Sequence, residues 1–138
     1  MESRLYRVNE SHLQEVWHGF SDFILKALAY NDDCFDLSDI YKAIENKEMQ
    51  LWVGFNNFDK IHVVCVTQVC VFPKKRVLDI ILTSGFDLPR WITHLEDIEN
   101  IAKEFKCSES RILGRDGWVK VLKPFGYEKT QVVLRKKL

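Results

Sequence analysis

The segment from Arg76 to Trp91, Arg-Val-Leu-Asp-Ile-Ile-Leu-Thr-Ser-Gly-Phe-Asp-Leu-Pro-Arg-Trp, decides how the chain is expected to fold. Its first half is an apolar run rich in β-branched residues, which predicts a buried strand. The run breaks at Ser84-Gly85, and a helix is expected from Asp87-Leu88-Pro89, because Asp suits an N-cap and Pro suits the first turn. A strand leading into a helix N-terminus presents backbone donors and a positive dipole end. The segment therefore suits a phosphate or another anion, although such joints also occur in α/β proteins that bind nothing there.

The composition indicates one soluble globular domain. The 138 residues are 46% hydrophobic and 29% charged, enough to enclose a single core. Twenty basic and twenty acidic side chains leave no net charge, which argues against nucleic-acid and anionic-membrane partners. No apolar run is long enough to cross a membrane, and the start of the chain has no signal-peptide pattern. We therefore expect a cytoplasmic protein with no membrane partner.

The cysteines and histidines show no spacing typical of a metal or redox site. The cysteines have no paired short spacing, which predicts reduced, mostly buried thiols. The histidines lie near no nucleophile pattern and are interpreted as surface or hydrogen-bonded residues. No metal site is expected at any of these eight residues, Cys34, Cys65, Cys70, Cys107, His12, His18, His62 and His94.

Hydrophobic periodicity predicts a mixed α/β (α+β) domain without internal repeats or linkers. Three consecutive strands joined by short turns predict an antiparallel meander. The helices are marked by capping residues at their starts and apolar positions at three- and four-residue steps. The expected elements are a strand at Leu5–Val8, a helix capped by Asn9 or by a Ser11–Gln14 capping box, a helix from Asp36 to Asn46, strands at Gln50–Phe55, Ile61–Phe72 and Arg76–Thr83, a helix over Leu88–Lys106, a strand at Glu109–Gly114, a short helix ending at Pro124, and a last strand at Thr130–Arg135.

This order, β-α-α-β-β-β-α-β-α-β, resembles the GNAT superfamily of N-acetyltransferases. Gly114–Tyr127 is similar to the family's closing segment, a short helix that ends in Gly-Phe or Gly-Tyr before the last strand. Val77–Trp91 lies where the family places its fourth strand and acyl-CoA-binding turn. The resemblance implies one domain over residues 1–138, with a GNAT-like mixed sheet of six to seven strands and helices on both faces. Small stand-alone proteins of this type look similar to GNAT-like proteins of bacteriophages.

Two motifs depart from the family pattern. The family's pyrophosphate loop usually reads Arg/Gln-x-x-Gly-x-Gly/Ala, whereas Thr83–Arg90 has one glycine and a proline that removes a backbone donor. The family often has a tyrosine four residues before the final glycine of the closing segment, as the acid that protonates the leaving thiolate. Leu122 occupies that position here. Both departures weaken the expectation of catalysis and leave the expected fold unchanged.

The resemblance implies acetyl-CoA as co-substrate and assigns it a site. The pantetheine would pair with the main chain near Leu82 and Thr83, where the fourth and fifth strands have to separate. The pyrophosphate would meet the N–H groups of the segment from Ser84, Gly85 and Phe86 to Arg90, and the Arg90 guanidinium would add charge-assisted bonds. Arg90 could equally be a solvated residue of a first helical turn.

Acetyl transfer to an amine also requires a base, because an ammonium has no lone pair with which to attack. Asp79, in the middle of a strand, is the best-placed carboxylate, although an ion pair with Lys or Arg would explain it as well. Tyr127 could replace the missing acid or simply pack. Trp118 could wall the acyl pocket or fill the core.

Two functions remain open from the sequence. The first is a GNAT-like N-acetyltransferase that transfers an acetyl group from acetyl-CoA to a small-molecule or protein amine of unknown identity. The second is a GNAT-fold protein that has lost catalysis and acts as a binding or assembly module. A homodimer formed through an exposed β-edge near the Ile61–Phe72 run would be compatible with either.

Overall fold

The computed structural model describes residues 5–29, 34–56, 58–85, 92–114 and 116–138. Over these residues the chain forms a mixed α/β domain, with 3₁₀ turns at Glu10–His12 and Lys123–Phe125. The strands and α-helices, in chain order, are β1 (Leu5–Arg7), α1 (Leu13–Leu28), α2 (Leu37–Glu45), β2 (Gln50–Phe55), β3 (Ile61–Val71), β4 (Arg76–Gly85), α4 (Leu95–Glu104), β5 (Glu109–Ile112) and α5 (Gly117–Leu122).

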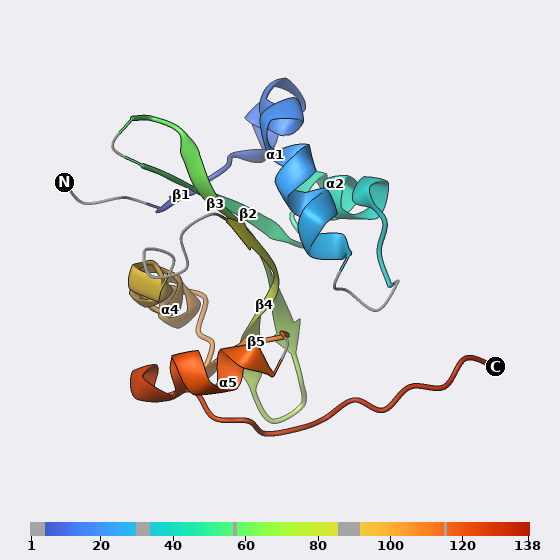
Figure 1. Cartoon of the computed structure of the whole chain (residues 1–138), viewed down its shortest axis with the longest axis vertical. Helices are drawn as coiled ribbons and strands as arrows, with labels where there is room; N and C mark the ends of the chain where they lie inside the picture. Colours follow the sequence, from blue (N-terminus) through green and yellow to red (C-terminus); the bar gives the residue numbers. More distant parts are fainter. Residues whose placement is uncertain (1–4, 30–33, 57, 86–91, 115) are drawn as a thin grey trace.

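The strands form one sheet in the order β1-β2-β3-β4-β5 (Figure 1). Neighbours from β1 to β4 pair antiparallel, and β5 pairs parallel with β4 after a crossover through α4. Helices α1 and α2 cover one face of the sheet, and α4 and α5 cover the other. The three-strand meander and the helices on both faces are confirmed.

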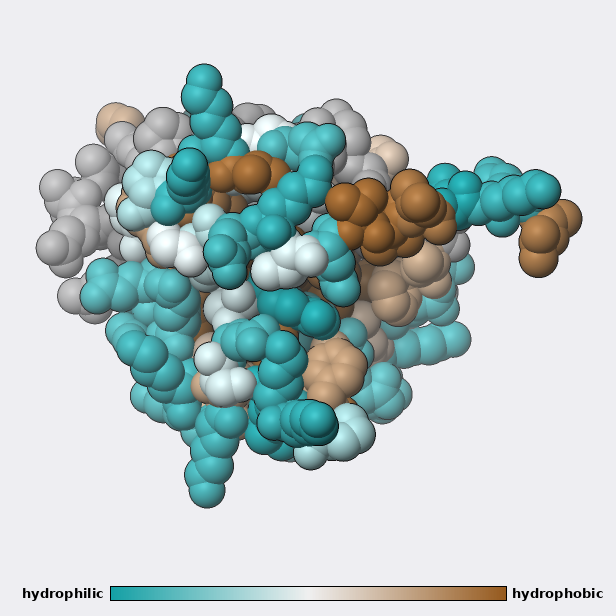
Figure 2. Space-filling model, turned by 90° about the horizontal axis from the view of Figure 1, so that it is seen from below, coloured by the Kyte–Doolittle hydropathy of each residue, from teal (hydrophilic) through white to brown (hydrophobic). Residues whose placement is uncertain are grey.

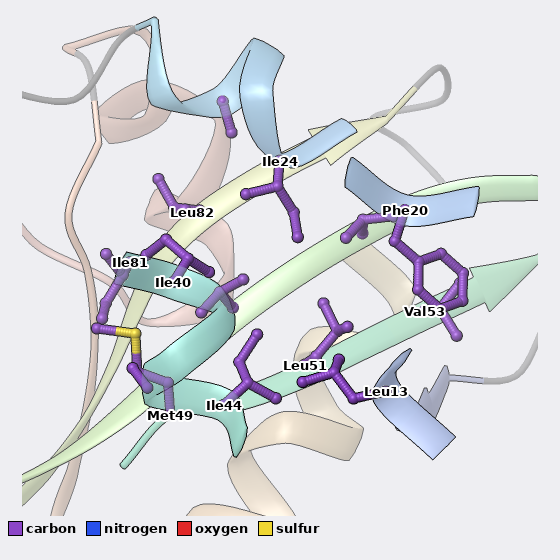
Figure 3. Close-up of a cluster of buried hydrophobic side chains, with 14 residues drawn as sticks. Leu13, Phe20, Ile24, Ile40, Ile44, Met49, Leu51, Val53, Ile81 and Leu82 are labelled. Carbon is purple, nitrogen blue, oxygen red and sulfur yellow. The ribbon is translucent and has the colours of Figure 1, made fainter. Parts of the chain in front are cut away.

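Each face of the sheet has its own apolar core. The α1/α2 face packs side chains of both helices onto β2, β3 and β4, as Figure 3 shows for Ile24, Ile40 and Leu51. The α4/α5 face packs Ile98 of α4 and Leu122 of α5 against the opposite side of the same strands. Alternate residues of one strand thus serve different cores, which is why β3 and β4 are apolar almost throughout.

Local capping signals set where the N-terminal helices begin. Asp36 accepts from the N–H of Asp39, whose side chain accepts from the N–H of Asp36, so the two residues form a capping box for α2. Asn9 accepts from the N–H of Ser11 and caps the 3₁₀ turn before α1. The alternative capping box of Ser11 and Gln14 was wrong, because α1 begins only at Leu13.

One expectation for the strands was wrong, and another holds only for part of a strand. Thr130–Arg135 forms no strand: it is an exposed, extended segment, so the described part of the chain has five strands rather than six or seven. The run that contains β3 is not at an edge, because β3 lies between β2 and β4. Val63–Thr67 pair with both neighbours, whereas Gln68–Val71 pair only with β4, so the homodimer expected near this run stays a prediction.

The helix expected over residues 88–106 is seen as α4, together with helical residues 92 and 93 and a turn at His94. Its expected start at Asp87 lies outside the described residues, as do Phe86, Arg90 and Trp91. Among the helices that the structure does describe, none has the length and apolarity needed to cross a bilayer.

Candidate functional site

Strands β4 and β5 pair over a short distance and then separate. Their parallel ladder runs from Val77 opposite Glu109 to Ile80 opposite Ile112. One further bond follows, from the N–H of Leu113 to the carbonyl oxygen of Ile80, at 3.2 Å. Beyond this bond β4 continues to Gly85, whereas the segment that follows β5 turns towards α5. The last five residues of β4, 81–85, therefore extend past the ladder with β5.

A β-bulge lies at the point of separation. In the ladder between β3 and β4, Thr67 is opposite Ile80 and Val66 is opposite Leu82, so Ile81 is an extra residue. A bulge bends its strand and increases the local twist. The bend falls directly after Ile80, the last residue of β4 that is paired with β5. It accounts for the divergence of the two strands.

The residues predicted to bind pantetheine follow this bulge. The side chain of Leu82 is buried in the α1/α2 core, so Leu82 can offer a ligand only its backbone. Thr83 lies on the opposite face of the sheet, with its Oγ1 4.0 Å from Sγ of Cys65. This placement agrees with a site built from main-chain groups at the end of β4.

Ser84 and Gly85 belong to the strand and not to a loop. They pair with Val64 and Val63 of β3, so the expected break of the strand at these two residues was wrong. A Cβ at Gly85 would lie 2.4 Å from the carbonyl oxygen of His62. Gly85 is therefore required by the close approach of two backbones.

Trp118 lies close to the point where the strands separate. A Cβ on Gly114, the residue after Leu113, would lie 2.7 Å from Cδ1 of Trp118. The half-buried indole thus lies against the backbone that leaves β5, and it also packs on the α4/α5 core. Trp118 therefore fills part of the core beside the separating strands, and its role as a wall of an acyl pocket stays a prediction.

Asp79 forms an ion pair with Arg111 of β5. Its two carboxylate oxygens accept from Nε and Nη2 of Arg111 at 2.6 and 2.8 Å, and Cys70 donates its thiol at 3.2 Å. Asp79 is 4% exposed, and the guanidinium lies over the ring of Phe72. The bond to Asp79 raises the pKa of Arg111. This bidentate arrangement is typical of a structural ion pair.

Tyr127 reaches across the α4/α5 face to β5. Its hydroxyl lies 3.0 Å from Oγ of Ser110 and 3.4 Å from a carboxylate oxygen of Glu99. Burial raises the pKa of Tyr127, and the bond to Ser110 opposes that shift in part. The phenol is therefore protonated at neutral pH and is a proton donor. Ser110 is two residues before the end of the ladder at Ile112.

A buried pair of histidines lies beside the end of β4, and the sequence reasoning did not foresee it. The Nε2 atoms of His62 and His94 are 3.2 Å apart, and the residues are 3% and 1% exposed. Gly54 makes room for them, because a Cβ there would lie 2.8 and 3.2 Å from the two Nε2 atoms. Asp97 lies 3.7 Å from Nδ1 of His94, and burial lowers the pKa of His94.

This pair connects the residue before α4 to the start of β3. In the ladder between β2 and β3, Gly54 is opposite Val63 and Phe55 is opposite Ile61, so His62 is itself a bulge residue. Nothing in the sequence marks this bulge. The clue that sequence could offer is a histidine within an otherwise apolar run, and it does not reveal a partner 32 residues away.

The cysteines near the site are poor nucleophiles. Burial raises the pKa of Cys65 to about 12, and burial together with its bond to Asp79 raises that of Cys70 to about 11. Neither thiol forms a thiolate at neutral pH, so neither suits covalent acyl transfer. Across the described ranges, His, Cys, Asp and Glu form no cluster of three or more that could hold a metal ion.

The predicted site residues thus form two groups. Leu82, Thr83, Ser84 and Gly85 lie together on β4 past the bulge, with Trp118 beside the separation. Asp79 and Tyr127 lie in the region where β4 and β5 are paired, on opposite faces of the sheet. Phe86 and Arg90 are outside the described residues.

No protein-family model matches the sequence, and no curated protein matches it as a relative. Solved structures do match, over almost their whole length. A Trypanosoma brucei acetyltransferase has a TM-score of 0.69 at 13% identity, covering 99% of this chain and 100% of that one. A predicted acetyltransferase from Clostridium acetobutylicum, solved with acetyl-CoA, has a TM-score of 0.68 at 13% identity, covering 98% and 96%. A GNAT family acetyltransferase from Staphylococcus aureus has a TM-score of 0.66 at 15% identity, covering all of both chains.

These identities are low, so the likeness concerns the fold, and activity has to be argued from the site. From β1 to α5 the element order and the helices on both faces are those expected from the sequence resemblance, whereas the expected last strand is absent from the described residues. The chain has the fold of the GNAT acetyltransferases.

Proposed function

We propose that this protein is an N-acetyltransferase that moves an acetyl group from acetyl-CoA to an amine. The observation that carries the proposal is the separation of β4 from β5 at the Ile81 bulge. It leaves the end of β4 with a side that β5 does not cover. The same fold occurs in an acetyltransferase solved with acetyl-CoA, which supports acetyl-CoA as the ligand.

Pantetheine suits this position because it contains two amide groups and can pair like a peptide strand. In our proposal it lies beside Leu82 and Thr83, in the direction that β5 would have taken. We propose that the pyrophosphate lies beyond Ser84 and Gly85 and that the Arg90 guanidinium binds it. The adenine and ribose are assigned no site.

The reaction is a direct transfer. The neutral amine attacks the thioester carbonyl, a C–N bond forms and the C–S bond breaks; the amine loses one proton and the thiolate gains one. We propose Tyr127 as the donor to the thiolate, since its hydroxyl is protonated at neutral pH. We propose Asp79 as the base. Because it lies on the face of the sheet opposite Tyr127, it can act only on an amine that reaches the thioester from that face, and only when its ion pair with Arg111 opens.

The alternative is a GNAT-fold module that binds a partner without catalysis, and one observation favours it. Leu122, at the position of the family's usual tyrosine, is 2% exposed and forms part of the α4/α5 core. That position therefore offers no proton donor. With Asp79 held by Arg111, the described residues provide less ready-made acid–base chemistry than the fold normally has.

A thermal-shift titration with acetyl-CoA tests binding. A ligand that binds only the folded state stabilises it by about 2.7 kcal/mol at a hundredfold excess over its dissociation constant. We expect a clear rise in Tm, which Arg90→Glu abolishes. The matched control is Lys74→Glu, the same charge change in the turn before β4, at the end of the strand opposite the site. No shift at millimolar acetyl-CoA would refute the cofactor assignment.

Turnover separates the enzyme from the module. Release of free CoA thiol, measured with a panel of small amines and lysine peptides, should depend on both acetyl-CoA and an amine. Binding of acetyl-CoA without amine-dependent thiol release across the panel would favour the module.

A further inference from the structure

The C-terminal segment Thr130–Leu138, here called the arm, is exposed along its whole length. Figure 1 shows it running past α5 and away from the body of the molecule. Its central residues Val132, Val133 and Leu134 are 65%, 75% and 92% exposed. Consecutive exposed apolar residues, two of them β-branched, are typical of a strand that lacks its sheet. Figure 2 shows apolar surface gathered where the arm leaves the body.

The sheet has a free edge that could accept such a strand. β5 is the last strand in the sheet order, and within the described residues it pairs only with β4. Its outer N–H and C=O groups therefore have no strand beside them. An edge of this kind is a template for another strand.

The apolar pattern of the arm matches both faces of the sheet at this edge. Ile112 points into the α4/α5 core, whereas Arg111 points to the other face, where its guanidinium lies over the ring of Phe72. Side chains of a strand alternate between faces, so Val133 would lie on one face and Val132 and Leu134 on the other. Apolar residues at this end of the sheet remain exposed, among them Val71, Phe72 and Leu113.

We propose that the arm of one molecule pairs with β5 of a second copy, and that the exchange is reciprocal. The chain is anchored just before the arm, where Lys129 lies 3.2 Å from Asp116 and Tyr127 bonds to Ser110. From these anchors the arm extends outward, so its own β5 is left uncovered. Two copies that exchange arms cover both β5 edges and form a closed, twofold-symmetric dimer.

Light scattering after size-exclusion chromatography of the full chain tests the proposal. We expect a dimer whose dissociation constant rises about tenfold or more in Val133→Asp and in Leu134→Asp, because each puts a charge into the paired strand. The matched control is Phe58→Asp, since Phe58 is 82% exposed in the turn between β2 and β3. A monomeric full chain, or a dimer that both arm variants leave intact, would overturn the proposal.

Amide hydrogen exchange of the unmodified chain gives an answer that needs no variant. Arm and β5 amides should become protected together as the protein concentration rises through the dimerisation range. Protection that does not depend on concentration would show the arm folded back on its own β5, and absence of protection would show it free. Either result contradicts arm exchange. Acetyl-CoA binding plays no part in either measurement, so this proposal can fail without the proposed function failing.

Discussion

The two halves of β4 are built differently, although they form one continuous strand. The first half, Arg76–Ile80, has β3 on one side and β5 on the other. Side chains tie it further to β5 and α4: Asp79 pairs with Arg111, and Arg76 donates to the carbonyl oxygen of Phe105. The second half, 81–85, keeps only β3 as a neighbouring strand and packs closely against the backbone of His62.

Under the proposed function, this difference lets one strand serve both as a scaffold and as a binding surface. A ligand-binding edge needs free backbone groups, which a fully paired strand lacks. The same edge has to be held rigidly if it is to bind with precision. In this chain the first half is paired on both sides, and a single extra residue, Ile81, begins the half that β5 does not pair with. The predictions below test the two halves in order of decreasing effect on stability.

The largest effect is expected in the paired half. Arg111→Met should lower the free energy of unfolding by about 3 kcal/mol, because it leaves the buried carboxylate of Asp79 without its partner. Asp79→Asn should lower the free energy of unfolding less, because Arg111 is about a quarter exposed and water can solvate its charge. The effect of the double variant should be smaller than the sum of the two single effects. Urea unfolding measures all three.

The matched control for this ion pair is Lys75→Met. Lys75 and Glu109 also join the ends of β4 and β5, at 2.8 Å, but each is 45% exposed. Its removal should cost less than about 1 kcal/mol. If Arg111→Met lowers the free energy of unfolding no more than Lys75→Met does, the ion pair of Asp79 and Arg111 is not what stabilises the paired half.

The same variants test the proposed base. If Asp79→Asn still transfers acetyl groups, Asp79 is not the base.

The second half should respond to steric change. Gly85→Ala is expected to cost about 1 to 3 kcal/mol, because its Cβ would lie 2.4 Å from a backbone oxygen and β3 or β4 would have to shift. Gly85→Ala should also reduce the rise in Tm caused by acetyl-CoA more than Arg111→Met does, because the movement of the strand displaces the proposed site itself.

Gly19→Ala provides the control for that substitution. Gly19 lies in α1, and a Cβ there has no atom within 4 Å. The change should stabilise the protein by about 0.5 to 1 kcal/mol through helix propensity alone. Chemical denaturation of both variants measures the contrast, and a neutral Gly85→Ala would show that the end of β4 is not tightly placed.

The sequence was sufficient wherever the structural signal is local. The capping box of Asp36 and Asp39 marks the start of α2 in four residues, and the apolar, β-branched runs joined by short turns mark the meander. The separation of β4 from β5 was expected from the family resemblance. It could not be derived from the residues, since nothing in Ile80-Ile81-Leu82 shows which of the three lacks a partner.

Features that depend on the register between strands could not be predicted from the sequence. The bulges at His62 and Ile81 exist only relative to neighbouring strands, and the pairing of His62 with His94 follows from one of them. The strand predicted at Thr130–Arg135 was wrong because the partner strand is missing. Its composition favours a strand, but a strand forms only beside another edge, and in this structure the segment has none next to it.

A fall in pH should lower the stability of the protein through His94, which lies beside the second half of β4. Burial lowers the pKa of His94 in the folded state, so the unfolded chain binds a proton first as the pH falls. Stability should be constant for this group above pH about 6.5 and decrease below it, by at most about 1.4 kcal/mol per pH unit for one proton. Below the pKa that His94 has in the folded state, this group causes no further loss of stability.

His94→Gln should remove that part of the pH dependence. Thermal unfolding followed from pH 8 to pH 5 measures the difference. Groups facing the pair include Asp97, which opposes the effect of burial by favouring the protonated ring. An Asp97→Asn variant should therefore steepen the loss in acid, and a flatter profile would refute the assignment.

The smallest change in stability, about 1 kcal/mol, is expected for Tyr127→Phe, which removes a partly buried hydroxyl and its bond to Ser110. This variant decides whether the paired half takes part in the chemistry. A packing residue would leave kcat near its original value once the protein is folded. Because a general acid contributes about 10² to 10⁴-fold, we expect kcat for acetyl transfer to fall by at least about a hundredfold, with little change in KM for acetyl-CoA. Ser110→Ala provides the comparison, since it removes the same bond and keeps the phenol. Equal losses in the two variants would assign Tyr127 to the scaffold and leave catalysis to the open half alone.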